Sequence, residues 1–434
     1  MHAVLWIVLA LIAVAILLRR RIEERLKVIE LVDRLPGPAS IPLLGSAWQF
    51  EWEIPKFVVQ MRGWAVKYTQ EGHGLIRIWL GTRPLIVAFS HQCVKEILES
   101  NSLIAKGPEY DIFIPWLGTG LLTSTGAKWR RRRKMLTPAF HFNVLRQFIP
   151  VFSEQAKRLT EVLSEQDLSM EFDVGPFLKR CALDIICETA MGCSVDAQRD
   201  TAHPYVLSTQ RLQKLVFAHQ RSPWLWIDFI WKLAGYGAEY RKHIDILQGF
   251  TLNVIHQRKD DYARDRMFYS GREKKAFLDF LLEMQESEEL SDDDIREEVE
   301  TFMFEGHDTT SHSMGWTLWC LAHYPDVQER VMQELDEVFG NSNRDCTSED
   351  LPKLKYLDRV LKESLRLFPS VPNMSRYAEE DVTIQGTSIP AGCTVLVSPT
   401  IIHRTPKIGF HENLVCPEVI SAPLLGFKMK LERR

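Results

Sequence analysis

The sequence contains no Cys-x-x-Cys pair, and its eight cysteines are spread over 434 residues. Structural zinc sites use closely spaced cysteine pairs, and disulfide frameworks belong to small secreted domains, so we expect neither. The chain also lacks an excess of basic residues, because 53 Lys and Arg stand against 57 Asp and Glu. The resulting net charge of −4 and pI near 6.4 argue against general nucleic-acid binding.

Hydrophobic residues make up 45% of the chain and charged residues 25%, the balance of a packed globular protein. No internal repeat or low-complexity segment is visible. Helical periodicity dominates residues 92–367. Short strands are predicted at residues 75–80, 85–89, 382–384 and 394–397. We therefore expect a mainly α fold with a small β-sheet region, in one mixed domain over residues 46–434.

Residues 3–18 form an apolar run that carries no charge, and Arg19, Arg20 and Arg21 follow directly. Sixteen helical residues rise about 24 Å, against a hydrocarbon core of about 30 Å. Residues 1–21 are therefore predicted to be a transmembrane anchor in a thin membrane such as the endoplasmic reticulum, with the body in the cytosol. The alternative is a cleaved signal peptide, whose charges should precede the apolar run. Residues 22–45, basic and then proline-rich, are predicted to be a linker.

A second segment, residues 222–237, is rich in tryptophan and other aromatic residues. Tryptophan gathers at membrane interfaces because its ring is apolar while its N–H group seeks water. Trp224 and Trp231 are therefore predicted to contact the membrane. The alternative is an ordinary core helix.

The most informative stretch is residues 291–323. Ser291 and Asp294 have the spacing of a capping box, and Pro325 ends the predicted helix. Apolar flanks enclose a run of small and polar residues, 305–313, which would be costly inside a buried helix without partners.

Within this run, Glu305, Asp308, Thr309 and His312 have the spacing i, i+3, i+4 and i+7, which predicts one common face. Gly306 would let something large approach the backbone. An acid beside a hydroxyl at a bound cofactor suits proton delivery. The alternatives are a solvent-exposed helix turn, or a carboxylate–histidine metal site, whose usual Glu-x-x-His spacing is absent.

Two further patterns have an ordinary structural explanation when taken alone. Glu363 and Arg366 lie one helical turn apart, which is typical of a common ion pair. Residues 129–134 begin with Trp129 and continue with basic residues, typical of a solvated basic face. Trp129 followed one turn later by Arg133 could also clamp an anionic group.

Together these patterns resemble the cytochrome P450 superfamily of haem-thiolate monooxygenases, and most closely its family 4, the branch associated with fatty-acid hydroxylation. The resemblance extends from the N-terminal segment to about Pro406. Its most specific part is the motif from Glu305 to Thr310. The other segments that carry it are residues 129–133, 181–192, 363–372, Arg376, His403 and Arg404.

The resemblance implies a role for each matching residue. Asp308 and Thr309 would relay protons to oxygen at the haem. Glu305 matches the acid that many family 4 members esterify to a haem methyl group. Trp129, Arg133 and Arg376 would contact the haem propionates. It also implies a lipid or fatty-acid substrate, an NADPH-dependent cytochrome reductase docked at the basic segment, and cytochrome b5 as a further partner.

One element of the family pattern is missing from the sequence. The cysteine thiolate that binds the haem iron lies in a loop of the form Phe-x-x-Gly-x-Arg-x-Cys-x-Gly, and no such motif follows Arg366. Cys393 is at a position that the family does not use, and Cys416 lacks the surrounding motif. The tail after Gly426 nevertheless alternates like a final strand. The sequence therefore predicts a P450 fold that is incomplete towards its C-terminus, with an internal deletion near residues 407–417, from a splice variant or a gene-model error, and no metal ligand.

Two functions remain open at this point. One is a membrane-bound monooxygenase of fatty acids or related lipids. The other is a catalytically inactive isoform that acts at most as a membrane-bound lipid-binding or regulatory protein, because oxygen activation depends on the thiolate.

Overall fold

The computed structural model describes residues 2–268, 276–287, 290–403, 415–417, 421–423 and 426–431. The chain forms two compact units, each with its own contacts. The first comprises Met1–Glu51, Val59–Gly107 and Met374–Ser398, and the second comprises Trp52–Val58, Pro108–Asn373 and Pro399–Arg434. The predicted domain over residues 46–434 stays a prediction, since a division by contacts does not test its boundaries. The division arises because the late strands return to pair with the early ones, which a local pattern does not reveal.

The first unit contains a four-stranded sheet with the order β1-β2-β7-β4. β2 and β7 are parallel, and the other neighbours are antiparallel. A separate hairpin joins β5 and β6. The elements are α1 (His2–Asp33), β1 (Leu75–Leu80), β2 (Arg83–Ala88), α3 (His91–Glu99), β4 (Met374–Tyr377), β5 (Val382–Ile384), β6 (Thr387–Ile389) and β7 (Thr394–Val397), with α2 (Ile54–Gln70) before β1. The predicted strands at 75–80, 382–384 and 394–397 are confirmed, and β2 begins two residues earlier than predicted.

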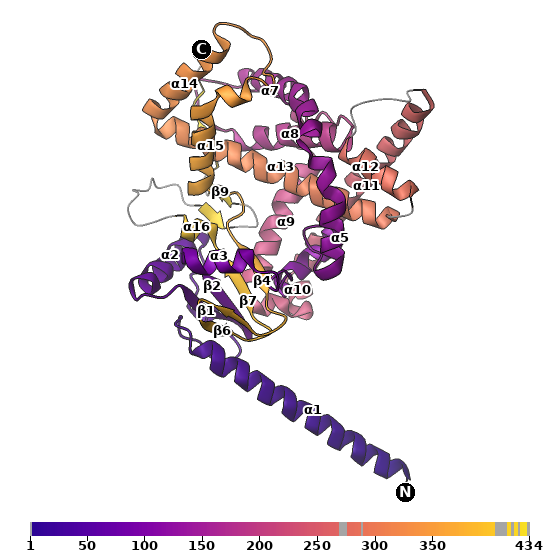
Figure 1. The fold of residues 1–434 in the computed structure, drawn as a ribbon, viewed down its shortest axis with the longest axis vertical. Helices are drawn as coiled ribbons and strands as arrows, with labels where there is room; N and C mark the ends of the chain where they lie inside the picture. Colours follow the sequence, from indigo (N-terminus) through magenta and orange to yellow (C-terminus); the bar gives the residue numbers. More distant parts are fainter. Residues whose placement is uncertain are drawn as a thin grey trace. The chain divides into compact units, whose positions relative to one another are not determined.

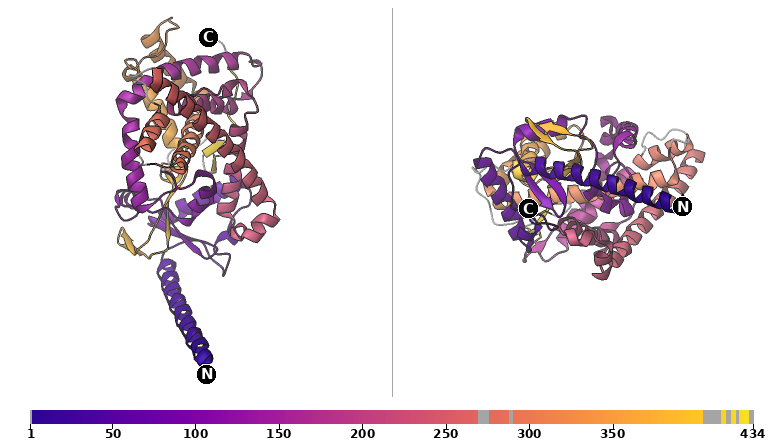
Figure 2. Two further views of the ribbon diagram at one scale, coloured as in Figure 1. Left: turned by 90° about the vertical axis from the view of Figure 1, so that its right-hand side faces the viewer. Right: turned by 90° about the horizontal axis from the view of Figure 1, so that it is seen from below.

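Helix α1 is longer than the predicted anchor. It continues through the three arginines to Asp33, and Figure 2 shows it as one unbroken helix. Its end is fixed to β1, where Asp33 accepts a hydrogen bond from the Trp79 indole at 2.9 Å and pairs with Arg77 at 2.9 Å. Among the residues that the structure describes, no helix combines the length and the apolar character of a membrane span. The predicted transmembrane helix is thus not supported, since the uncharged run, at sixteen residues, falls short of the roughly 20 that a span requires.

The second unit is almost entirely helical. Its helices are α4 (Ile114–Leu117), α5 (Gly126–Leu136), α6 (Phe142–Leu145), α7 (Ile149–Ser164), α8 (Gly175–Ile186), α9 (Pro204–Arg221), α10 (Asp228–Leu233), α11 (Tyr236–Phe268), α12 (Phe277–Glu286), α13 (Asp292–His323), α14 (Pro325–Phe339), α15 (Lys355–Leu367) and α16 (Pro399–Ile402). Its strands are short: β3 (Phe172–Asp173), β8 (Val415–Pro417), β9 (Ser421–Pro423) and β10 (Lys428–Met429).

Helix α13 is the centre of this unit. It runs beside α8, and it also contacts α11, α12 and α15 (Figure 1). The surrounding core is built from apolar side chains of α4, α8, α9, α11, α12 and α13, including Trp116, Leu183, Leu212 and Phe304, which are fully buried. A helix enclosed in this way must satisfy every polar group that it carries.

The end of the described chain belongs to a second apolar cluster of this unit, separate from that core. β10 pairs antiparallel with β3, which confirms the predicted final strand. Phe427 is buried against Trp316, with ring centroids 5.3 Å apart and planes nearly perpendicular. Asp173 accepts a hydrogen bond from the Phe427 N–H at 2.9 Å, and Gly426 adopts a φ of 75° in the turn before it. Without a Cβ, Gly426 takes this left-handed conformation at little cost.

Candidate functional site

Helix α13 begins and ends as predicted. Ser291 is its N-cap, and Ser291 and Asp294 exchange hydrogen bonds in a capping box. The helix ends at His323, directly before Pro325 opens α14. The polar run 305–313 is therefore helical throughout and lies in the middle of the second unit's core.

Most polar side chains of this run bond to the helix itself. The Thr309 hydroxyl donates to the Glu305 carbonyl at 2.7 Å, and the Thr310 hydroxyl donates to the Gly306 carbonyl at 2.6 Å. The Nδ1 atoms of His307 and His312 lie 2.8 and 2.7 Å from the carbonyl oxygens of the residues four positions earlier. Such back-bonding removes much of the cost that the sequence pattern suggested.

Asp308 is the exception, because its partners come from other helices. Its carboxylate lies 2.9 Å from the Lys179 ammonium of α8 and accepts a hydrogen bond from the Gln213 amide of α9 at 2.8 Å. His312 Nδ1 lies 3.6 Å away. Asp308 is fully buried, and Lys179 nearly so. The acid of the predicted pair is thus held between α8, α9 and α13.

The electrostatics of this group favour a charged acid beside neutral imidazoles. Burial alone would raise the pKa of Asp308, but the Lys179 ammonium, with the neighbouring histidine rings, outweighs burial and holds that pKa well below its usual range. Burial lowers the pKa of His312 to about 4, and the positive charge of Lys179 acts in the same direction. Asp308 is therefore a carboxylate near neutral pH, and His312 is neutral.

The predicted common face of α13 is in fact divided between two environments. Asp308 and His312 are buried against α8 and α9, whereas Glu305 and Thr309 are only half-buried. At 100° per residue, the four positions span an arc of about 100°, wide enough to meet two different neighbours. Glu305 and Thr309 therefore lie on the more accessible side, where a bound group could reach them.

Gly306 has a different role from the one predicted. A Cβ at this position would lie 2.6 Å from Cδ1 of Ile186. The group that approaches the Gly306 backbone is therefore a side chain of α8. This close approach explains the glycine without invoking a cofactor.

Helix α5 is fixed to the first turns of α13 by part of its basic run. Arg132 is buried and forms an ion pair with Asp294, and Lys128 lies 3.2 Å from Glu297. Trp129 is half-buried and Arg133 is exposed, one turn apart on α5. The other basic residues of the run, Arg130, Arg131 and Lys134, are also exposed. Only the exposed residues are available to an acidic partner.

Two other predicted residue groups have clear positions. Glu363 and Arg366 of α15 form a two-point ion pair with distances of 2.6 and 2.7 Å, and Arg366 also donates to the His403 carbonyl. Arg376 belongs to the first unit, on β4, where its guanidinium donates to the Ser375 carbonyl at 2.9 Å. The structure thus confirms the Glu–Arg pair, and it places the predicted propionate-binding residues Trp129 and Arg133 on one helix.

The cysteines decide how well the described residues fit a haem. A thiolate ligand needs a thiol that is easily deprotonated. Burial raises the pKa of Cys181 and of Cys393 to about 12, and that of Cys193 to about 11. The side chain of Cys416 lies outside the described residues. Cys181, Cys193 and Cys393 are therefore not the readily ionised thiols that a haem iron ligand requires.

A metal site of another kind was an alternative for α13. Within the described ranges, no group of three or more His, Cys, Asp or Glu side chains could hold a metal ion.

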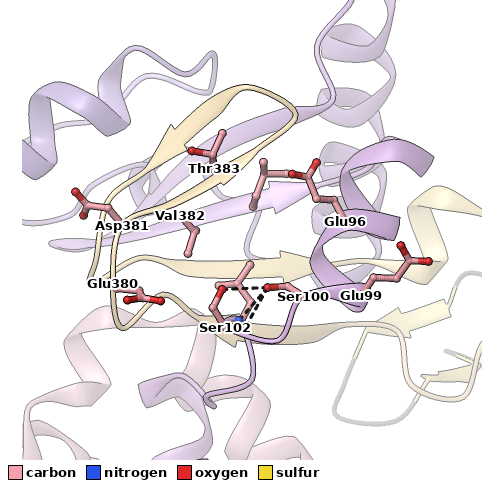
Figure 3. A pocket seen from close by; sticks show the side chains of 10 residues that line it. Glu96, Glu99, Ser100, Ser102, Glu380, Asp381, Val382 and Thr383 are labelled. Carbon is pink, nitrogen blue, oxygen red and sulfur yellow. Dashed lines mark hydrogen bonds between the residues drawn. The ribbon is translucent and has the colours of Figure 1, made fainter.

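A pocket of about 420 Å³ lies in the first unit, between α3 and the β5–β6 hairpin (Figure 3). Glu96, Glu99, Glu380 and Asp381 line it. The predicted catalytic and cofactor residues are not among its lining residues.

Lys179 and Gln213 are partners of Asp308 that were not predicted from the sequence. Lys179 follows Leu178 and stands, with Arg180, before a strongly apolar stretch of α8. A basic residue at the start of an apolar helix predicts a buried partner of opposite charge, and this signal could have identified it. Gln213 gives no comparable signal, because a single glutamine on a long helix is usually exposed.

In the predicted membrane-contact segment, residues 222–237, Trp231 is buried, whereas Trp224 and Trp226 are half-buried. Trp231 is buried and packs against His219, Tyr236 and Tyr240. The side chains that project from this segment are Ile227, Phe229 and Leu233, with exposed fractions of 54%, 71% and 75%. Trp231 therefore contacts the core, whereas Ile227, Phe229 and Leu233 form the exposed apolar surface.

Comparison with known proteins gives consistent matches. The family model Cytochrome P450 matches residues 35–410. The chain is 43% identical to Cytochrome P450 4V2 of Mus musculus over 380 residues, which cover 85% of this chain and 72% of that protein. It is 40% identical to Cytochrome P450 4c3 of Drosophila melanogaster over 409 residues, covering 89% and 75%. It is 38% identical to Cytochrome P450 4c21 of Blattella germanica over 396 residues, covering 89% and 78%.

Proposed function

Because this chain belongs to the cytochrome P450 family and is similar to family 4 members, we propose that its fold serves the hydroxylation of fatty acids or related lipids. The reaction would use dioxygen and electrons from an NADPH-dependent reductase. The family implies a haem cofactor, which supplies the oxygen chemistry when it is bound.

The observation that carries the proposal is the arrangement on α13. Asp308 is a buried carboxylate held by Lys179, and Thr309, the next residue, turns its side chain towards the accessible side of the helix. A carboxylate fixed beside a hydroxyl can accept a hydrogen bond and so orient the group through which a proton passes. We propose Asp308 and Thr309 as the catalytic pair, with Glu305, Trp129, Arg133 and Arg376 as cofactor contacts.

The exposed basic residues of α5 support a docking site for the reductase, with cytochrome b5 as a further partner. Arg130 and Lys134 are exposed and would meet an acidic face. We also propose association with the endoplasmic reticulum membrane through the apolar N-terminal residues and the exposed side chains of residues 227–233. The catalytic body would then lie on the cytosolic side.

A second candidate function is favoured for the chain as its sequence stands. The thiolate loop is missing from the sequence, and burial raises the pKa of Cys181 and of Cys393. A chain without that ligand would be a catalytically inactive isoform, acting at most as a lipid-binding or regulatory protein. The family model ends its match at residue 410, within the interval 407–417 where we propose an internal deletion. Sequencing the transcript across these codons tests whether a longer reading frame exists.

Turnover separates the two candidates. The full chain would be incubated with a reductase, NADPH and a series of fatty acids of different length, and the hydroxylated product measured. Product that falls by about 100-fold or more in Asp308→Asn, but not in the exposed-site control Glu329→Gln, supports the monooxygenase. Absence of product from protein that still binds the fatty acid supports the inactive isoform.

A further inference from the structure

Three fully buried polar side chains of the second unit carry an atom without a hydrogen-bond partner. The atoms are Tyr205 Oη, Glu300 Oε1 and His307 Nε2, and each of these residues is 0% exposed. An unpaired buried polar group costs about 1–3 kcal/mol. Buried polar groups of native proteins are almost always paired, many of them with ordered water. These three atoms therefore call for a partner.

The three side chains border the same interior region. Tyr205 lies on α9, and Glu300 and His307 lie two turns apart on the face of α13 that points away from Glu305. The rings of Tyr205 and His307 meet edge to face, with centroids 5.4 Å apart. Among the neighbouring charged groups, Glu300 contributes most to the raised pKa of Tyr205. Tyr205 therefore lies next to His307 and within electrostatic reach of Glu300.

The hydrogen-bonding roles of the three side chains are complementary to water. His307 Nδ1 lies 2.8 Å from the Met303 carbonyl and must donate to it, so Nε2 is an acceptor. The Tyr205 hydroxyl is a donor. Glu300 Oε2 accepts from the Trp116 indole at 3.1 Å. Burial raises the pKa of Glu300 to about 7, although hydrogen bonds with Thr251 and Trp116 act in the opposite direction, so its carboxyl group can donate in its protonated form. Water can accept from the two donors and donate to the imidazole.

We propose that Tyr205, Glu300 and His307 line an interior water-binding site. Polar cavities take up water, whereas apolar cavities of similar size stay dry, and buried water typically makes about three hydrogen bonds. The site lies beside the Asp308–Lys179 pair but on the side of α13 away from Glu305 and Thr309. The inference therefore holds whether or not the chain is a monooxygenase.

The experiment is NMR relaxation dispersion of the water oxygen nuclei, which counts long-lived interior water in the full-length chain. Tyr205→Phe removes one ligand of the site, and we expect the number of long-lived waters to fall by about one. Tyr240→Phe is the matched control, because that buried tyrosine donates directly to the Ile112 carbonyl. We expect the control to leave the number unchanged.

An equal signal from the wild-type chain and Tyr205→Phe would overturn the proposal, as would an equal loss in both variants. A crystal structure of the wild-type chain gives an independent answer if Tyr205→Phe fails to fold. Density for water within hydrogen-bond distance of at least two of the three atoms supports the site. Direct bonds among the three side chains, with no water between them, would refute it.

Discussion

At the scale of single residues, the charge on Asp308 has the greatest consequence. It is a carboxylate inside a core of helices. Its negative charge is stabilised by the Lys179 ammonium, which lies 2.9 Å away, and by a hydrogen bond from the Gln213 amide. A buried charge is tolerated only with such partners, because removal from water costs several kcal/mol per ion. Lys179 is therefore as necessary to the site as Asp308 itself.

Lys179→Met should destabilise the chain strongly. It leaves the Asp308 charge buried and uncompensated, which typically costs about 3–5 kcal/mol. The measurement is urea-induced unfolding at neutral pH. The double variant Lys179→Met with Asp308→Asn should recover part of this loss, because no lone charge remains. A loss in the double variant equal to the sum of both single losses would contradict the pairing.

Glu298 predicts a pH dependence of stability. Burial raises its pKa to about 7, although a hydrogen bond from the Leu121 N–H and the charge of Arg132 act in the opposite direction. The pKa of Glu298 is thus higher in the folded than in the unfolded state, so its protonated carboxyl group favours folding. This contribution to the free energy of unfolding is complete below the unfolded-state pKa and is lost as the pH rises through the folded-state pKa. Stability should therefore fall between about pH 5 and pH 8, by roughly 3 kcal/mol from this residue.

Glu298→Gln should flatten this decline, as measured by the free energy of unfolding at several pH values. The exposed-site variant Glu329→Gln is the control and should keep the wild-type slope. An unchanged slope in Glu298→Gln would show that this carboxyl group does not have the raised pKa.

At the scale of elements, α13 shows what its sequence could and could not reveal. Its cap, its end at His323 and its polar interruption follow from local rules about capping, proline and periodicity. The division of its polar face could not be predicted, because it depends on which helices pack against each side. Gly306 illustrates this, since the helix that contacts it, α8, lies more than one hundred residues earlier in the sequence.

The strand β10 and the residue before it should contribute substantially to stability. Phe427 packs on Trp316, and Phe427→Ala would leave a cavity in that cluster, at a cost of about 3–5 kcal/mol. Lys428→Ala, at an exposed position of β10, should change stability by about 0.5 kcal/mol or less. Urea unfolding of both variants is the measurement. Equal stabilities would show that this segment is not docked in solution.

Helix α10 and its flanks should bind lipid through exposed apolar side chains rather than through tryptophan. Replacing Ile227, Phe229 and Leu233 together by Ser should lower partitioning into liposomes by roughly tenfold or more, because each side chain loses apolar area that the lipid would cover. The control is Leu361→Ser with Leu365→Ser, two exposed residues of α15. Equal losses in the control would indicate non-specific adhesion.

At the scale of the whole molecule, the family, the helical character and most strands were predictable from local patterns and motif order. The division into two units was not, because it arises from the parallel pairing of β2 with β7, more than three hundred residues apart. The partner of Asp308 was also not predicted, since an ion pair between α8 and α13 leaves no periodic signal. The predicted transmembrane helix is not supported. The prediction relied on the arginines that follow the apolar run, although the run itself is short.

The central claim is that this chain belongs to the cytochrome P450 family but lacks the family's iron-ligand loop in its sequence. The most direct test is the difference spectrum of the purified full-length protein, reduced and then exposed to carbon monoxide. The account predicts that no thiolate-type Soret band appears, whether haem is taken up or not. A clear thiolate-type band would contradict it and would require a cysteine ligand outside the described side chains.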